Sequence, residues 1–391
     1  METILNKQKA LRLPMILTEE QQMLKDSARE FFREKSPISA LRKLRDEADA
    51  TGFDPALWRE MAELGYASLT IPEAYGGLAF GYVGLGQVLE ESGRTLAASP
   101  LVSTVLLGAT AIQLGGSDAQ KEAHLPAIAS GEALISLALE EGSQHKPTDI
   151  SLRARKTADG FNLNGTKQFV LDGHVAHTFI VAARTSGDTD SGAGISLFLV
   201  DAASEGVQVK RSLMVDSRNA AQLTFKEVEV AASALLGEWD NGYALLENVL
   251  DIGRIGIAAE MLGSIQEAFD RTVAYLKERK QFGTPIGAFQ ALQHRAAQMY
   301  CEIELCKSAV LKALQAIDQG APTLPVLASI AKAKVSETIE RVTNEGVQMF
   351  GGIGMTDDEE IGFFLKRGRV AQHTLGDYRF HLDRFAKLNG Y

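Results

Sequence analysis

The residues best suited to chemistry lie in the segment 279–290 (RKQFGTPIGAFQ). The guanidinium of Arg279 presents a rigid fork of donors, which matches phosphate oxygens two at a time. A helix end would account for part of the pattern, with Arg279 in the last turn, Gly283 as a cap and Pro285 as a stop. So specific a string rarely arises from packing alone, and it indicates a functional site.

A second string, 348–355 (QMFGGIGM), is rich in glycine. Glycine has no Cβ, so the backbone at Gly351 and Gly352 can come close to a ligand. Main-chain amides beside Gln348 could then bind a dinucleotide. A loop after an apolar helix would show the same double glycine.

Together the two strings resemble the signatures of the acyl-CoA dehydrogenase family, in its order and at about its spacing. The segments 64–77 (LGYASLTIPEAYGG), 164–170 (NGTKQFV) and 182–185 (AART) extend the resemblance over nearly the whole chain. In that family the Arg, Gln and Phe of the first string contact the pyrophosphate and adenosine half of FAD, commonly FAD held mainly by a neighbouring subunit. The flavin ring lies against a strand that begins at an aromatic residue, here Phe169, although a buried strand also favours Phe. The resemblance therefore implies FAD contacts at Arg279, Gln281, Phe282, Gln290, Gln348, Gly351, Gly352 and Phe169.

The resemblance also implies a reaction, the α,β-dehydrogenation of an acyl-CoA thioester with electrons leaving through an electron-transfer flavoprotein. A base must remove the α-proton while the β-hydrogen passes to the flavin as hydride. Most members supply a Glu in a Tyr-Glu-Gly-Thr string, and the matching segment here, 373–381 (HTLGDYRFH), has Leu375 at that position. A branch of the family places Glu before an Arg of the first bundle helix. Matching that Arg to Arg254, a candidate substrate contact, puts Gly253 there.

Three alternatives follow from the missing base. Asp377 lies two positions after Leu375, and its carboxylate could serve if the loop is shifted. Asp251, one helical turn before Arg254, could project toward the same pocket. Alternatively, the chain could be a partner subunit that shares active sites with a second dehydrogenase-like chain, as in the steroid-degrading branch. Each Asp could equally be a surface or capping residue.

The flavin loop departs from the family pattern as well. The usual Thr-Glu-Pro-x-x-Gly-Ser-Asp is replaced by 140–147 (EEGSQHKP), so the carboxylate of Glu140 stands where a hydroxyl could bond the flavin edge. The usual Trp-x-Thr becomes 169–171 (FVL), which removes another side-chain donor. These changes affect the contacts to the flavin ring and leave the pyrophosphate motifs intact.

The composition is that of an ordinary folded protein, with 391 residues of which 45% are hydrophobic and 23% charged. A formal net charge of −10 argues against a nucleic-acid partner. No run reaches the roughly twenty apolar residues that span a bilayer. The opening METILNK lacks the apolar core of a secretory signal. We therefore expect a cytoplasmic protein without a membrane span.

The two cysteines, Cys301 and Cys306, are spaced neither as a redox pair nor as zinc ligands. We expect both to be small core residues in a reducing compartment. None of the seven histidines is spaced as a metal ligand, so no metal site is expected.

Helical periodicity precedes and follows a β-prone region that begins near residue 133. Thr18 and Gln21 predict a capping box for the first helix, which Ser36-Pro37 ends. The dipeptides Asp159-Gly160 and Asn164-Gly165 are typical of hairpins. Expected helices are 55–64, 81–93, 101–115, 119–129, 243–280, 289–318, 325–350 and a last piece ending near 388; expected strands are 178–181, 195–200, 207–210 and 223–230.

The order of elements is that of the resembled family, and we predict an α+β multidomain protein. It comprises an N-terminal helical domain (1–130), a central small β-barrel (131–239) and a C-terminal four-helix bundle (240–391). The resemblance places FAD between the β-domain and the bundle, with its site completed across a subunit boundary. A homodimer or homotetramer is therefore expected, or an oligomer with a second dehydrogenase-like chain.

Overall fold

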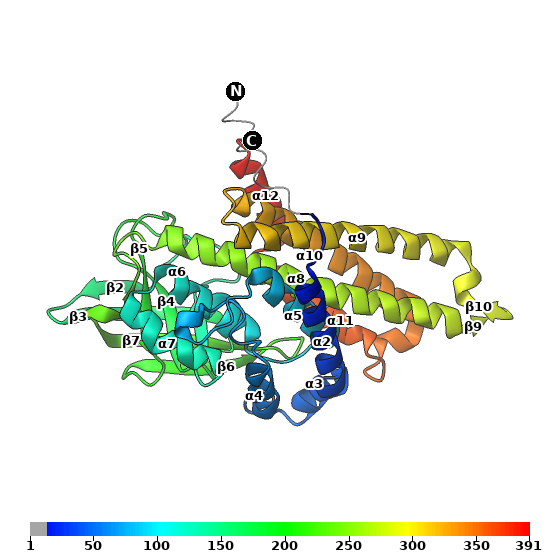
Figure 1. Cartoon of the computed structure of the whole chain (residues 1–391), viewed down its shortest axis with the longest axis horizontal. Helices are drawn as coiled ribbons and strands as arrows, with labels where there is room; N and C mark the ends of the chain where they lie inside the picture. The colour runs from blue at the N-terminus through cyan, green and yellow to red at the C-terminus, as the bar shows by residue number, and fades with distance from the viewer. Residues whose placement is uncertain (1–13) are drawn as a thin grey trace.

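The computed structural model describes residues 14–391, so the opening METILNK lies outside the described residues. A group of helices, a β-domain and a second group of helices follow one another along the chain. Figure 1 shows the β-domain at one end of an elongated molecule and the long helices of the bundle extending to the other end. The predicted fold class, with two helical domains around a central β-domain, is confirmed. Within the described residues, every helix is too short or too polar to cross a bilayer.

The N-terminal domain begins with the predicted capping box, in which the Thr18 hydroxyl accepts from the Gln21 backbone. The apolar segment 101–115 was expected to be one α-helix, but its first part is a π-helix that lies against the β-domain. Periodicity of apolar residues does not distinguish the two helix types, and π-helical turns are frequent at functional sites. The helices are α2 (Glu19–Lys35), α3 (Ile38–Asp46), α4 (Pro55–Glu63), η1 (Glu73–Tyr75), α5 (Tyr82–Arg94), the π-helix η2 (Leu101–Ala109), α6 (Thr110–Gly115) and α7 (Asp118–Ala129).

The β-domain is a mixed sheet of eight strands in the order β6-β7-β3-β2-β4-β5-β8, with β1 paired in parallel to β4. The four predicted strands lie within β4 to β7. The strands are β1 (Ile135–Ala138), β2 (Arg153–Lys156), β3 (Gly160–Leu171), β4 (Thr178–Arg184), β5 (Ile195–Asp201), β6 (Val207–Leu213), β7 (Asn219–Ala231) and β8 (Leu235–Leu236), with the 3-10 turn η3 (Ala232–Ala234) before β8.

One of the two predicted hairpin turns is wrong. Asp159-Gly160 does lie where β2 turns into β3. Asn164-Gly165 instead lies inside β3, where the register with β7 shifts between Leu163 and Gly165. An internal glycine in a strand marks a bulge as readily as a turn, and the pairing on both sides decides which.

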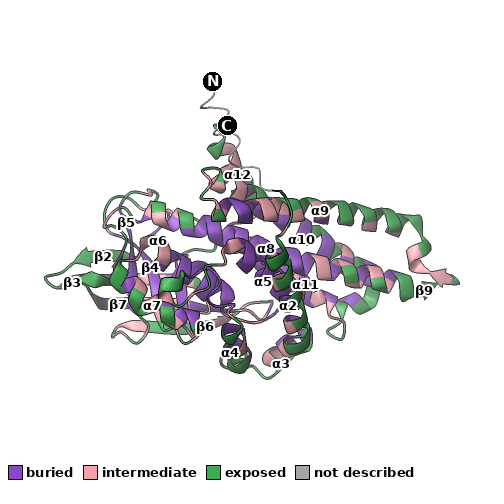
Figure 2. Ribbon diagram, viewed as in Figure 1, coloured by how far each residue is buried: buried purple, intermediate pink, exposed green. Residues whose placement is uncertain are grey.

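The bundle is built on α8 (Tyr243–Glu278), whose central part is buried on all sides. Figure 2 shows this burial, together with the largely exposed α9 and β9 end. A Cβ at Gly263 would overlap the backbone of α5, so glycine allows the two helices to pack closely. The remaining elements are β9 (Lys280–Gln281), β10 (Thr284–Pro285), η4 (Ile286–Ala288), α9 (Gln290–Asp318), α10 (Leu324–Phe350), η5 (Gly351–Met355), α11 (Ile361–His373) and α12 (Tyr378–Leu388).

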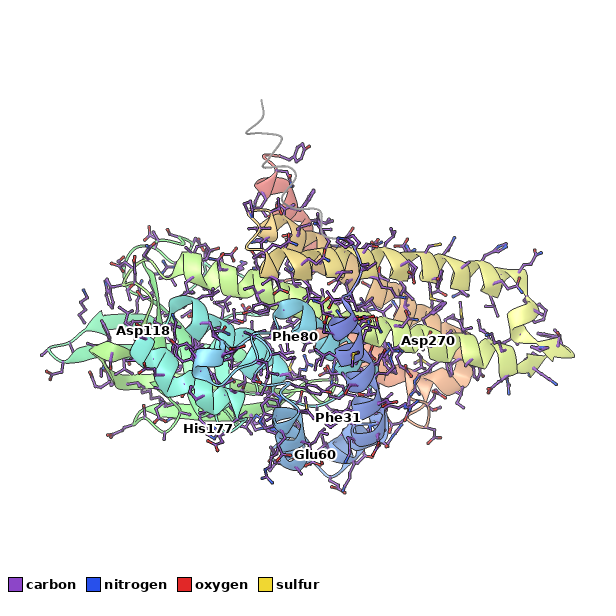
Figure 3. The ribbon with its side chains drawn as sticks, viewed as in Figure 1. Phe31, Glu60, Phe80, Asp118, His177 and Asp270 are labelled. Carbon is purple, nitrogen blue, oxygen red and sulfur yellow. The ribbon has the colours of Figure 1, made fainter. Side chains whose placement is uncertain are left out.

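Ion pairs also join the N-terminal domain to the bundle. Arg94 of α5 donates to Glu267 and to Asp270 of α8, and Figure 3 shows Asp270 on that helix. On α9, Cys306 is buried as predicted. Cys301 is exposed, so its predicted place in the core was wrong. Five positions on a helix correspond to well over one turn, and the two cysteines therefore face different sides.

Candidate active site

A cavity of about 310 Å³ lies where the β-domain meets the bundle. Its walls come from all three domains: η2, the loop that follows β1, the end of β3, the loop after β6, and α11 with the loop after it. Apolar side chains dominate, and most of the polar groups lie on the loop after β1 and at the end of α11. The lining residues include Ser103, Leu107, Leu139, Glu140, His145, Gln168, Phe169, Met214, Arg369, His373 and Leu375.

Two residues of the cavity wall have left-handed backbone conformations that non-glycine residues seldom adopt. Phe169 has φ 51°, at a register shift between Lys167 and Val170 of β3. The bulge re-aims the side chain, which lines the cavity and is 47% exposed. Leu375 has φ 56° in the loop between α11 and α12. Backbone strain of this kind concentrates at functional sites.

The two family base positions, Leu375 and Gly253, form a single apolar wall. Leu375 and Leu107 line the cavity. A Cβ at Gly253 would lie 2.5 Å from a methyl carbon of Leu107 and 2.8 Å from one of Leu375. A side chain at 253 would therefore require these two leucines to shift, and neither position carries a carboxylate.

Asp377, predicted as a base, is the N-cap of α12. Its Oδ1 accepts a hydrogen bond of 2.8 Å from the backbone N–H of Phe380. Asp377 is not among the residues that line the cavity. Because the capping role directs the carboxylate at a helix end, the structure does not bring it into the cavity.

Asp251, the second predicted base, is buried in an ion-pair network. Its carboxylate lies 2.8 Å from Arg254 Nη1 and 2.9 Å from Arg384 Nη2. Glu247 accepts from the same two arginines. Both oxygens of the Asp251 carboxylate are thus paired with arginines, and Asp251 is not among the residues that line the cavity. Arg254, predicted to bind substrate, is fully buried behind the cavity wall and also donates to the carbonyl of Leu375 at 3.4 Å.

A linked pair in the cavity was missed by the sequence analysis. His145 Nδ1 lies 2.5 Å from Oε1 of Glu140, and His145 Nε2 lies 3.1 Å from Nη2 of Arg254. The sequence indicated only that a hydroxyl had been lost at position 140. The signal that the sequence offered was a Glu and a His five positions apart in the segment 140–147. This segment matches the flavin loop of the resembled family.

Two buried ionisable groups lie behind the cavity. Burial raises the pKa of Asp172 to about 6, although Ser103 donates to its carboxyl at 2.6 Å. Burial also lowers the pKa of Lys332 to about 7. Its Nζ donates to the carbonyls of Gln372 and Gly376, each at 2.9 Å. Lys332 therefore fixes the loop that carries Leu375.

The other predicted cofactor residues lie at the far end of the bundle, which we call the bundle tip (residues 279–290 and 348–355). Phe282 and Gly283 form the turn between β9 and β10, with φ of 55° and 81°. This turn leaves the Phe282 side chain 93% exposed. The rings of Tyr275 and Phe350 stack at 4.2 Å and join the two segments. Arg279, Gln281, Gln290, Gln348, Gly351 and Gly352 are all exposed there.

The bundle tip is remote from the cavity of the same chain. Gly253, beside the cavity, and Glu278, at the tip, are roughly 25 residues apart on α8, which corresponds to about 37 Å at 1.5 Å per residue. Figure 1 shows α8 running from the β-domain to β9 and β10. The structure therefore separates Phe169 from all the other predicted cofactor contacts.

Similarity to known proteins extends over nearly the whole chain. Family models match along the chain: the acyl-CoA dehydrogenase N-terminal domain at residues 18–132, the middle domain at 138–228 and the C-terminal domain at 240–387. The probable acyl-CoA dehydrogenase YngJ of Bacillus subtilis is 33% identical over 365 residues, 91% of this chain and 94% of that protein. The chain belongs to the acyl-CoA dehydrogenase family.

Solved structures agree with this assignment to the acyl-CoA dehydrogenases. Butyryl-CoA dehydrogenase from Megasphaera elsdenii is 30% identical with a TM-score of 0.88, over 96% of this chain and 100% of that one. A chain of the ChsE4–ChsE5 complex from Mycobacterium tuberculosis is 25% identical with a TM-score of 0.88, over 97% of this chain and 100% of that one. Relatives at this similarity are oxidoreductases that act on CH–CH groups, and members of the family are FAD flavoproteins.

The described residues fit the cofactor of acyl-CoA dehydrogenases. A Cβ at Gly351 or Gly352 would meet open space, so the backbone there is accessible to a ligand. Arg279 and Phe282 are exposed beside it, an arrangement that suits phosphate oxygens and an adenine ring. No cluster of three or more potential metal ligands occurs in residues 14–391.

Proposed function

We propose that this chain is an FAD-dependent acyl-CoA dehydrogenase that forms a double bond between Cα and Cβ of an acyl-CoA thioester. The cavity at the junction of the three domains carries the proposal, because it is largely apolar and Phe169 projects into it. When bound, FAD supplies the hydride acceptor. An electron-transfer flavoprotein would reoxidise it, as the family resemblance implies. The expected cytoplasmic location remains a prediction.

The residues of this chain would act in two places. Phe169 would contact the flavin ring, and the apolar wall of Leu107 and Leu375 would exclude water from the acyl chain. Arg279, Gln281, Phe282, Gln290, Gln348, Gly351 and Gly352 would bind the pyrophosphate and adenosine of FAD that lies mainly in another copy. Within one chain, the cavity and the bundle tip are about 37 Å apart along α8. If the tip contacts FAD held by another copy, a single FAD molecule does not have to span this distance.

Absorbance spectroscopy of the purified chain tests this function. The protein should be yellow and should bleach when acyl-CoA thioesters are added without oxygen, with the chain-length preference showing the acyl group. A colourless protein that takes up no FAD would reject the assignment.

A second function has specific support, namely that of a catalytically silent subunit. The two family base positions, Leu375 and Gly253, carry no carboxylate and form an apolar wall. Asp251 pairs with Arg384, and Asp377 caps α12. Similarity to a chain of the ChsE4–ChsE5 complex favours a mixed oligomer with a second dehydrogenase-like chain. In that case the flavin would bleach only after the second chain is added.

A further inference from the structure

The cavity holds a carboxylate at neither of the family's two base positions. Among the cavity-lining residues of the described chain, Glu140 is the one with a carboxyl side chain. We propose that Glu140 is the base that removes the α-proton and that His145 positions it. This inference rests on the proposed dehydrogenase function and names the residue that performs its proton transfer.

The contacts of His145 determine which of its nitrogens carries the proton. An arginine can only donate, so His145 Nε2, 3.1 Å from Arg254 Nη2, must accept. Nδ1 then carries the hydrogen and donates it to Oε1 of Glu140 over 2.5 Å. His145 is therefore the donor that fixes the orientation of the Glu140 carboxylate.

The same contacts place Glu140 near the wall where the family base is missing. Arg254 joins His145 to the carbonyl of Leu375, and Leu375 lines the cavity that Glu140 also lines. The His145 side chain is 4% exposed and that of Glu140 is 19% exposed. The imidazole is thus packed in the protein, whereas the carboxylate retains access to the cavity. An edge contact between His145 and Phe380, at 4.8 Å, holds the ring from another side.

The other nearby carboxylates are bound to different groups. Asp251 pairs with Arg254 and Arg384, and Asp377 caps α12. Asp172 lies behind Ser103, which donates to it and stands between it and the cavity. Glu141, next in sequence, accepts from Lys167 and from two backbone amides. Glu140 is left as the carboxylate that lines the cavity.

The proton transfer balances with the proposed reaction. A Glu140 oxygen takes the proton from Cα of the thioester, and the electron pair of that C–H bond becomes the second Cα–Cβ bond. The hydride from Cβ goes to the flavin. The enoyl thioester then leaves, and Glu140 releases its proton to water. His145 keeps its own proton throughout and acts as a positioning residue.

Hydrogen exchange at Cα isolates this step from flavin reduction. We would use the FAD-loaded protein with a series of β,β-dimethyl acyl-CoA thioesters, which have α-hydrogens but no β-hydrogen to transfer. Deuterium uptake from D₂O, followed by mass spectrometry, should be rapid for the wild type and fall about 100- to 10,000-fold in Glu140→Gln. FAD binding, measured separately, should persist. Asp383→Asn, an exposed carboxylate on α12, is the matched control and should exchange at the wild-type rate.

A rescue variant guards against simple misfolding. Leu375 lines the same cavity, so adding Leu375→Glu to Glu140→Gln should restore exchange by at least tenfold. Exchange that survives in Glu140→Gln, or exchange lost in Asp377→Asn instead, would overturn the assignment of Glu140. So would a wild-type chain that binds FAD but exchanges no thioester of the series by itself. These outcomes leave the dehydrogenase function to its own test, the yellow colour and its bleaching.

His145 has a separate test, since a positioning residue can be partly replaced. In His145→Asn the side-chain amide can still donate to Glu140, whereas His145→Ala offers no donor. We expect the maximal exchange rate to fall more than tenfold in the Ala variant and to recover at least threefold in the Asn variant, with the thioester concentration at half-maximal rate unchanged. Equal rates in both variants, or an effect confined to that concentration, would reject the positioning role.

Discussion

The bundle tip and the cavity wall differ in how their residues are held. At the tip, Arg279, Phe282 and Gly352 are exposed on a hairpin and a glycine loop. At the cavity, Glu140, His145 and Arg254 belong to a chain of hydrogen bonds that continues through buried carboxylates. The tip keeps the family's residues, whereas the wall departs from them. Under the proposed function, the tip would bind the pyrophosphate and adenosine of FAD and the wall would carry out proton transfer, so the two could change independently.

The largest effect is expected on the folding free energy, at the ion pairs around Arg254 behind the cavity wall. Replacing Arg254 with Met leaves the buried Asp251 and the partly buried Glu247 with Arg384 as their remaining cation. Removing one member of a buried ion-pair network costs about 3–5 kcal/mol of folding free energy. Urea unfolding would measure it, with Arg341→Met, an exposed residue of α10, as the control at about 0.5 kcal/mol or less. If Arg254→Met lowers the free energy of unfolding by less than about 1 kcal/mol, the proposed difference between a wall held by buried ion pairs and an exposed tip is wrong.

The buried carboxyl behind the wall should make stability depend on pH. Burial raises the pKa of Asp172 from 3.8 to about 6. The unfolded chain therefore ionises first, and the folded protein loses stability as the pH rises from about 4 to 6, by on the order of 3 kcal/mol. Asp172→Asn does not ionise, so it should be more stable than the wild type at pH 7.5, by a margin that falls to about a third at pH 4.5. Urea unfolding of the variant and the wild type at both pH values would measure this difference, with the exposed Asp188→Asn as the control. A stability difference that is the same at both pH values would show that Asp172 is not desolvated.

A substitution at the bundle tip should lower the affinity for FAD and leave the folding stability unchanged. Arg279→Ala removes a charge-assisted contact to phosphate, which is worth about 1.5–3 kcal/mol, or roughly ten- to a hundredfold in FAD affinity. Because Arg279 is exposed, the unfolding midpoint of the apo protein should not change. Titration of apo protein with FAD measures the first quantity and thermal unfolding the second. Affinity equal to that of the wild type, in the same oligomeric state, would disprove the phosphate contact.

The smallest effect is expected at Asp377. Asp377→Ala removes the N-cap of α12 and should cost about 1 kcal/mol, whereas Asp377→Asn keeps a capping oxygen and should cost a few tenths. Flavin reduction should be little changed in the Asn variant. Stopped-flow bleaching tests this directly: loss of reduction by several orders of magnitude in Asp377→Asn would restore the sequence-based prediction that it is the base.

Local patterns in the sequence predicted most of the fold. The Thr18 capping box, the strands that became β4 to β7 and the long bundle helices depend on neighbours along the chain, which the sequence contains directly. The π-helix at Leu101–Ala109 was not predicted, since apolar residues on every side fit either helix type. The bulge at Gly165 was taken for a turn because its strand pairing depends on β7, far along the chain.

The candidate site was harder to predict for the same reason. Motif matching placed the residues of the bundle tip and Phe169, but it could not show that Gly253 and Leu375 share one wall. Asp377 lies two positions from the missing Glu, and Asp251 lies one helical turn before Arg254. Asp377 caps α12 through the N–H of Phe380, a local contact that the sequence also allowed. Asp251 is held by Arg384, 133 positions away, a contact that no spacing rule contains. The Glu140 and His145 pair depends on Arg254, which is 109 positions away in the sequence.

A complementation experiment tests most directly whether cavity and tip serve one cofactor from two copies of the chain. Arg279→Ala weakens the tip, and Gly142→Trp fills the cavity from a position where a Cβ meets open space. Each variant alone should bind FAD poorly. If the variants are unfolded together and refolded at equal concentration, half of the dimers pair the two chains, and each such dimer has one intact site. We predict recovery of about one quarter of wild-type FAD binding at limiting FAD in the mixture. Parent variants that assemble together but recover no FAD binding would contradict the account.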